Sequence, residues 1–177
     1  ISTDTNTVNL EVATNPYAFV GWRRWDPPGS WTLPLASDPP VVPPTNLQTV
    51  AAAGALNDFT LLGGAPGAQG IVRYDGSQTR SFRIGITATT VRPVFCIFDA
   101  IASFYVGVNT GGVFSQISQS IQRERYNLVE ADVVVHVEAI AELAPNDEVA
   151  LMVGSNAVPA IGLALRLDGY TLVVTSV

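Results

Sequence analysis

The stretch VVVHVEAIAE, residues 133–142, decides the fold class. Along it an apolar set of side chains alternates with a mixed set; the apolar set is Val133, Val135, Val137, Ala139 and Ala141, and the mixed set is Val134, His136, Glu138, Ile140 and Glu142. A period of two is typical of a β-strand, because successive side chains point to opposite faces of a sheet. We therefore predict a strand here, with one face packed on a core.

The same period recurs through the second half of the chain. Alternating runs cover residues 82–89, 161–168 and 170–175, and turn-forming residues lie between them: Asp75-Gly76, Asn109 to Gly112, Pro145-Asn146-Asp147, Gly154-Ser155-Asn156 and Asp168-Gly169. Such spacing predicts an all-β, antiparallel sandwich or barrel. Residues 115–127 fit either a helix or an exposed strand with a loop.

Composition separates the N-terminal third from the rest. Residues 14–46 contain eight of the 12 prolines and all 3 tryptophans. Paired prolines exclude both a helix and a central strand from this stretch, so we predict that residues 1–60 are an extended arm and that residues 61–177 are the head. Aromatic and arginine side chains dominate buried interfaces, and the predicted partner-binding residues of the arm are Tyr17, Phe19, Trp22, Arg23, Arg24, Trp25 and Trp31. The arm lies either on its own head or on a partner subunit.

Charge and cysteine content exclude several classes of protein. The 177 residues are 47% hydrophobic and only 14% charged, with a net charge of −6. That balance argues against nucleic-acid and anionic-membrane partners, because both require concentrated positive charge. A single cysteine excludes an internal disulfide framework and a CxxC metal site. We expect no cofactor.

Catalytic and metal-binding chemistry has little support in the sequence. His136 is the only histidine, and Glu138 shares its face, so the pair fits a base or pH switch less well than a structural or interface contact. Cys96 lies in an apolar run that keeps a thiol protonated. Asp75, Asp147, Glu148 and Asp168 fit either calcium ligands or solvated turn acids, the second being favoured. We expect no metal site and no enzymatic activity.

Some predicted strands are apolar on both faces, as in residues 133–135, 173–174 and 95–98. An antiparallel sandwich normally exposes one face of each sheet, so a strand with two apolar faces implies that its outer face is covered. We therefore expect a homo-oligomer built through a sheet face, with Val134 and His136 in the interface.

The head resembles the trimeric jelly roll of the tumour-necrosis-factor and complement-type globular heads, above all its versions in viral and phage fibre and capsid-surface proteins. Four segments carry the resemblance in order: residues 71–82, residues 104–111, residues 140–151 and residues 170–174. Two positions depart from the family pattern, since Asn146 stands where the family usually has glycine and Thr110 precedes the glycines of its turn. The resemblance implies an antiparallel jelly roll and a homotrimer, with Tyr170, Leu172 and Val174 near the trimer axis.

The resemblance also implies a role. The leading hypothesis is a structural protein of the virion surface, a capsid decoration or cement protein whose arm binds major capsid protein subunits. The alternative is a receptor-binding fibre tip or lectin-like head that recognises a host surface ligand. An enzyme that uses His136 is a distant third.

Overall fold

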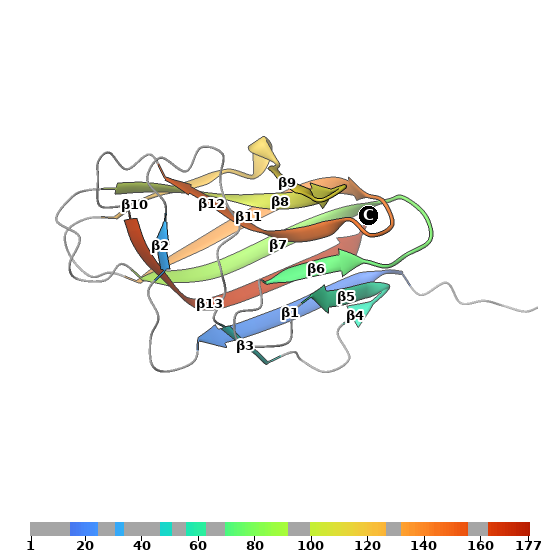
Figure 1. The fold of residues 1–177 in the computed structure, drawn as a ribbon, viewed down its shortest axis with the longest axis horizontal. Coiled ribbons are helices and arrows are strands. Elements are labelled where there is room, and N and C mark those ends of the chain that lie inside the picture. Colours follow the sequence, from blue (N-terminus) through green and yellow to red (C-terminus); the bar gives the residue numbers. More distant parts are fainter. Residues whose placement is uncertain are drawn as a thin grey trace, which may run out of the picture.

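The structure is a computed structural model, and it describes residues 15–24, 31–33, 47–50, 56–62, 70–91, 100–126, 132–155 and 163–177. Two antiparallel sheets pack face to face, as Figure 1 shows. Apart from one 3₁₀ turn, η1 (Ser118–Ser120), the regular elements in these ranges are strands. The predicted all-β jelly-roll sandwich is therefore confirmed.

The first sheet has seven strands. Its main path runs β11-β7-β13-β1-β3, with β2 paired to β13 and β4 paired to β1. The strands are β1 (Tyr17–Arg24), β2 (Trp31–Leu33), β3 (Leu47–Val50), β4 (Leu56–Asn57), β7 (Arg80–Val91), β11 (Asp132–Leu143) and β13 (Leu163–Ser176).

The second sheet has six strands. Its path runs β10-β8-β12-β6-β5, with β9 paired to β8. The strands are β5 (Phe59–Leu62), β6 (Ile71–Tyr74), β8 (Ala100–Thr110), β9 (Val113–Gln116), β10 (Gln122–Tyr126) and β12 (Glu148–Ser155). The sequence left residues 115–127 ambiguous. The described residues of this segment, 115–126, are the end of β9, a short 3₁₀ turn and β10, which is an edge strand in the described part of the sheet.

The core lies between the two sheets and is formed by one alternate set of side chains from each strand. Phe82, Ile84, Ile86 and Ala88 of β7 are at most 1% exposed, as the alternation predicts. Phe82 also meets the rings of Phe59 and Tyr74, with centroids 5.4 and 4.9 Å apart and edge-to-face geometry. Aromatic rings from both sheets therefore lock the sandwich together at this end.

Part of the predicted arm is a strand of the head. β1 pairs with β13 over seven residues, from Tyr17↔Thr175 to Arg23↔Gly169, and Ala18 and Val20 lie in the core at 1% exposure. The prediction that this region holds no central strand was wrong. The strand β1 contains no proline, since Pro16 directly precedes it and Pro27 follows it in the sequence. β1 is therefore a strand of the head, although it precedes the predicted boundary at residue 60.

β13 also differs from its prediction. The Asp168-Gly169 pair was expected to be a turn between two strands, but β13 continues through it as one strand of 14 residues. Its register against β7 shifts between Leu167 and Gly169, which is the signature of a β-bulge. A glycine in a strand marks a bulge as readily as a turn.

Candidate functional site

The outer face of the seven-stranded sheet brings four strands into register as three rows of side chains. One row crosses the sheet as Tyr17, Thr175, Arg83 and Ile140. The next row is Phe19, Val173, Gly85 and Glu138, and the third is Gly21, Thr171, Thr87 and His136. Because Leu172 and Val174 point to the core, their neighbours on β13 must point outward.

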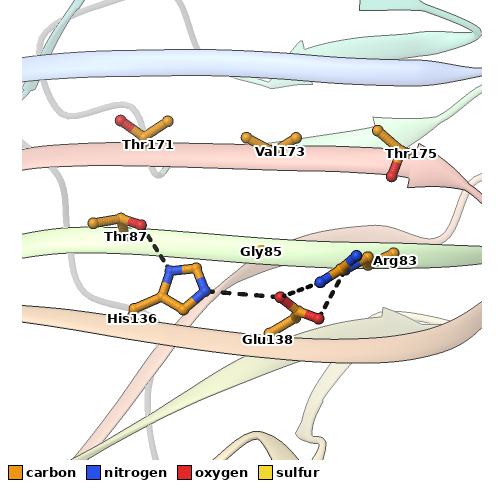
Figure 2. A pocket seen from close by; sticks show the side chains of 8 residues that line it. All are labelled: Arg83, Gly85, Thr87, His136, Glu138, Thr171, Val173 and Thr175. Atoms are coloured by element: carbon orange, nitrogen blue, oxygen red, sulfur yellow. Dashed lines mark hydrogen bonds and ion pairs between the residues drawn. The ribbon is translucent and has the colours of Figure 1, made fainter.

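A shallow depression of about 300 Å³ lies in the middle of this face. Figure 2 shows that Gly85 is at its centre, between Val173 on one side and Glu138 on the other. Because glycine has no side chain, the outer surface of the sheet is deepest at Gly85. A Cβ at Gly85 would still fit, since its nearest neighbour would be His136 Cε1 at 3.8 Å, an ordinary van der Waals contact.

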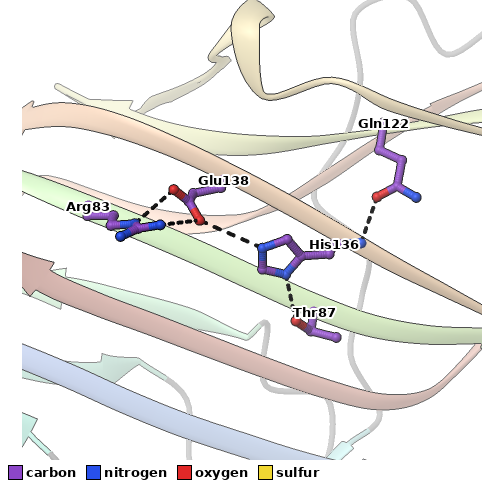
Figure 3. A network of polar contacts seen from close by, with 5 residues as sticks. All are labelled: Arg83, Thr87, Gln122, His136 and Glu138. Atoms are coloured by element: carbon purple, nitrogen blue, oxygen red, sulfur yellow. Dashed lines mark hydrogen bonds and ion pairs between the residues drawn. The ribbon is translucent and has the colours of Figure 1, made fainter.

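An ion-pair network forms one wall of the depression (Figure 3). Arg83 donates two hydrogen bonds to Glu138, from Nε at 2.8 Å and from Nη2 at 3.1 Å. His136 Nε2 is 3.8 Å from Glu138 Oε2, and His136 Nδ1 is 2.9 Å from the hydroxyl of Thr87. The side chains of Arg83, Glu138 and His136 are 62%, 41% and 58% exposed, so this polar network lies open on the sheet surface.

The network shifts the acid–base properties of its ion pair. The hydrogen bond from Arg83 lowers the pKa of Glu138 below its ordinary value. Reciprocally, the hydrogen bond to Glu138 raises the pKa of Arg83. Both shifts favour the charged forms, so Arg83 and Glu138 stay ionised through the neutral range.

A side chain from the opposite sheet closes the open edge of β11. Gln122, at the start of β10, accepts a hydrogen bond from the backbone N–H of His136 at 2.7 Å and donates one to Glu124 at 2.7 Å. β11 is the last strand of its sheet in the described part of the chain. An edge strand exposes backbone donors, and Gln122 satisfies one of them beside the site.

Exposed apolar side chains lie on the two strands that flank the polar depression. On β11, Val134 and Ile140 stand at opposite ends of the His136–Glu138 pair and are 62% and 66% exposed; on β1, Tyr17 and Phe19 are neighbours on the outer face and are 40% and 44% exposed. These two pairs are the aliphatic strip and the aromatic strip. β7 and β13 lie between the two strips, so about 14 Å separates them at the usual strand spacing. Exposed apolar groups gathered on one face are typical of an interaction surface.

The arrangement resembles a hydrolase triad in residue types more than in geometry. A hydroxyl, an imidazole and a carboxylate follow one another in Thr87, His136 and Glu138. At 3.8 Å, however, the carboxylate is beyond hydrogen-bond reach of the imidazole, and Arg83 engages both of its oxygens. This geometry favours an ion-pair network over a nucleophile and its base.

The acids weighed as calcium ligands have protein partners where the structure describes their side chains. Asp75 accepts hydrogen bonds from Arg73 and Thr60, and Asp147 accepts one from the backbone N–H of Ala144 at 2.9 Å. Glu148 accepts one from Asn109 at 2.7 Å. Among the described ranges, no three potential metal ligands of the His, Cys, Asp or Glu type cluster together.

Two of the predicted trimer-interface residues lie elsewhere. Leu172 and Val174 are fully buried between the sheets, so they stabilise the single chain and present nothing to a neighbour. The resemblance placed them on the wrong face of β13; Val173 is the apolar residue that faces outward. Val134 and His136 do lie on the outer face, whereas the side chain of Tyr170 is outside the described part of the structure.

The predicted partner-binding residues divide in the same way. Tyr17 and Phe19 lie on the outer face, as part of β1 and not of a separate arm. Trp22, Arg23 and Arg24 belong to the backbone of β1 and Trp31 to that of β2, but their side chains are outside the described part, as are Trp25 and Cys96 altogether. Whether these residues bind a partner stays a prediction.

Sequence reasoning missed Arg83, Thr87, Val173 and Ile140 as members of the site. Arg83 is 55 residues from Glu138 along the chain, and only the pairing of β7 with β11 brings the two together. For β13 a signal was present, because Thr171 and Thr175 mark the polar side of the strand and hence its outer face.

Comparisons with known proteins identify the fold. No family model matches the chain, and no curated protein matches it in sequence. Among solved structures, the chain is similar to that of Eiger TNF from S. frugiperda, with a TM-score of 0.51 and 14% identity over 90% of this chain and 92% of that one. In the described part of the chain no helix is long and apolar enough to cross a membrane. At 14% identity the likeness concerns the fold alone, and the chain has a TNF-type jelly-roll fold.

Proposed function

We propose that this protein is a structural, non-enzymatic protein that forms a homotrimer through the outer face of its seven-stranded sheet and decorates the surface of a virus or phage particle. The observation that carries the self-association is the pair of apolar strips on that face, Val134 with Ile140 and Tyr17 with Phe19. These four side chains account for half of the large hydrophobic residues that are exposed in the described part of the chain.

The placement of the strips favours a ring. In a two-fold dimer the same patch meets itself, whereas in a closed ring each copy uses two different patches. Here an aliphatic strip lies at one margin of the face and an aromatic strip lies three strands away. We propose that the aliphatic strip of one copy packs on the aromatic strip of the next, and the resemblance to trimeric jelly-roll heads sets the number of copies at three.

The polar depression then lies between the two contacts. Its ionic pair is already matched within one chain, since Arg83 and Glu138 neutralise each other through two hydrogen bonds. A charge that is paired and hydrogen-bonded costs less to remove from water than an isolated one. The outer face can therefore be partly covered without leaving an unpaired charge at neutral pH.

The virion part of the proposal has a different basis. It rests on the resemblance of residues 71–174 to viral and phage capsid-surface proteins, and on a net charge of −6 that disfavours nucleic-acid binding. The insect TNF structure supports the jelly-roll architecture and leaves the biological setting to experiment.

Disulfide trapping tests the ring. In a Cys96→Ser background, the double variant Phe19→Cys/Val134→Cys should form covalent dimers and trimers on mild oxidation, because each copy offers one thiol to each neighbour. The single variants Phe19→Cys and Val134→Cys are the matched controls and should remain uncross-linked. Cross-linking of the single variants, or none in the double variant, would contradict the head-to-tail packing.

Immunogold electron microscopy tests the location. Antibody to the purified protein should label the surface of particles from the source culture at regularly spaced positions. Label confined to the tips of fibres would favour the receptor-binding alternative. Particles without label would refute the virion assignment.

A further inference from the structure

We infer that acid dissociates the trimer, with His136 as the group that responds. This inference rests on the proposed function, because it assigns a regulation to the face that the trimer would cover. It starts from the geometry of the outer face, where a single histidine lies next to an ion pair that is already complete.

The surroundings of His136 decide what its protonation would do. On β7 it meets the uncharged hydroxyl of Thr87, and on β13 the neighbouring residue of the depression is Thr171, also uncharged. Glu138 on its own strand is the nearest anion, at 3.8 Å. From the opposite sheet it meets Gln122, through its backbone.

The elements around His136 carry both positively and negatively charged residues. The elements packed against β11 are β7, β8, β10 and the η1 turn. Besides His136 and Glu138, β11 and these elements carry the following charged or titratable residues, none of them on η1: Asp132 and Glu142 on β11, Arg80 and Arg83 on β7, Tyr105 on β8, and Arg123, Glu124, Arg125 and Tyr126 on β10. Of the β10 set, Glu124 is held by the amide of Gln122. No second carboxylate in the described part of the chain is shown to bond to His136.

Glu138 cannot pair equally well with Arg83 and with a protonated His136. Both of its oxygens accept hydrogen bonds from Arg83, and the oxygen nearest to His136 is the one that accepts from Nη2. With neutral His136 the three side chains sum to zero charge. With protonated His136 they sum to one positive charge per protomer, and a trimer gathers three such charges.

The sign of the effect follows from solvation. In the separated protomer His136 is 58% exposed, so water solvates its protonated form. Covering the face removes that water, and a buried charge without a full partner is disfavoured. Because the separated protomers bind the proton better than the trimer does, acid shifts the equilibrium toward protomers.

The range and the size of the response follow from the same argument. Histidine side chains change charge between pH 5 and pH 8, while Glu138, whose pKa the Arg83 hydrogen bond lowers, stays ionised. A trimer holds three copies, so a tenfold penalty on each becomes about a thousandfold rise in the trimer dissociation constant.

Sedimentation velocity of the full chain between pH 7.5 and pH 5.5 tests the inference. Wild type should change from trimer to protomer as the pH falls, and far-UV circular dichroism should show that the protomers keep their fold. His136→Gln should remain trimeric over the whole range, since glutamine is polar and does not titrate. Val113→Gln is the matched control, because it introduces the same side chain on β9 of the other sheet, where Val113 is 72% exposed, and leaves His136 in place; it should dissociate in acid as wild type does.

The possible failures are distinguishable. A wild-type trimer that persists unchanged at pH 5.5 would overturn the acid response and leave the proposed trimer standing. Equal dissociation of wild type and His136→Gln would assign the response to another group and overturn the role of His136. A monomer at every pH would overturn the proposed trimer and the acid response together.

Discussion

The two faces of the seven-stranded sheet come from the same strands and have opposite characters. The inner face is apolar apart from the buried Thr90, whose hydroxyl donates a hydrogen bond to the backbone carbonyl of Val133. Its best-buried apolar side chains are at most 1% exposed: Phe82, Ile84, Ile86, Val135, Val137, Leu172 and Val174. The outer face places an ion pair, a histidine and threonines between apolar strips that remain 40–66% exposed. The described part of one chain buries the inner face, whereas it leaves apolar area of the outer face exposed.

The largest expected effect is on the inner face. Phe82→Ala should lower the free energy of unfolding by about 3–5 kcal/mol, because it removes a fully buried ring that packs on Phe59 and Tyr74. The matched change on the outer face is Phe19→Ala, which should cost less than about 1 kcal/mol in the separated protomer. Urea denaturation at low protein concentration measures the free energy of unfolding of both variants. An equal decrease for Phe82→Ala and Phe19→Ala would contradict the proposed difference between the two faces.

A charge introduced on the outer face should weaken the association of the trimer without destabilising the folded protomer. Val134→Glu should raise the trimer dissociation constant about a hundredfold or more, since it buries a charge in an apolar contact. Its control is Val113→Glu, on β9 of the other sheet, where the side chain is 72% exposed. Sedimentation measures the association, and an unchanged constant for Val134→Glu would show that the strip is not in the interface.

Loss of the ion pair should have a smaller effect. Arg83→Gln leaves Glu138 as an unmatched charge and should weaken association about tenfold. The pKa of Glu138 should rise toward its ordinary value of 4.5, which a carbon-13 NMR titration measures directly. A carboxylate whose pKa is lowered by folding stabilises the fold above its ordinary pKa, and this contribution is lost as the pH falls through the lowered pKa. In Arg83→Gln, the stability of the fold should therefore no longer depend on pH through Glu138. An unaltered titration of Glu138 would contradict the pairing with Arg83.

The smallest effect concerns the floor of the depression. Gly85→Ala should stabilise the protomer by about 0.5–1 kcal/mol, because alanine loses less conformational entropy than glycine in a strand and its Cβ fits beside His136. Gly76→Ala is the contrasting variant, since its Cβ would overlap the buried side chain of Tyr74 and should destabilise the fold. Thermal unfolding of the two variants gives the comparison, and a destabilised Gly85→Ala would mean that the depression is tighter than its geometry indicates.

How far the sequence predicted the fold depends on the strand. For β7 and β11 the alternation assigned the faces correctly, because one alternate set of each strand is apolar through its centre while the other set contains Arg83 and Thr87 on β7 and His136 and Glu138 on β11. For β13 the alternation was seen but the face was misassigned, since Val173 and Val174 leave both sides apolar at that point and the bulge after Leu167 changes the register. For β1 the surrounding prolines hid a strand that contains none of them.

The site was less predictable than the fold. The pairing of His136 with Glu138 follows from their spacing on one strand, and the structure places both on the outer face. The contacts of Arg83, Thr87 and Gln122 depend on register between strands and on packing between sheets. No local pattern in the chain encodes that register, so the network emerges only in three dimensions.

Mass measurement of the purified chain tests the central claim most directly. Sedimentation equilibrium at pH 7.5 and micromolar concentration should give three times the chain mass of 18.7 kDa. A species of the single-chain mass at every concentration would mean that water covers the outer face without a partner, and the assembly proposed for that face would be refuted.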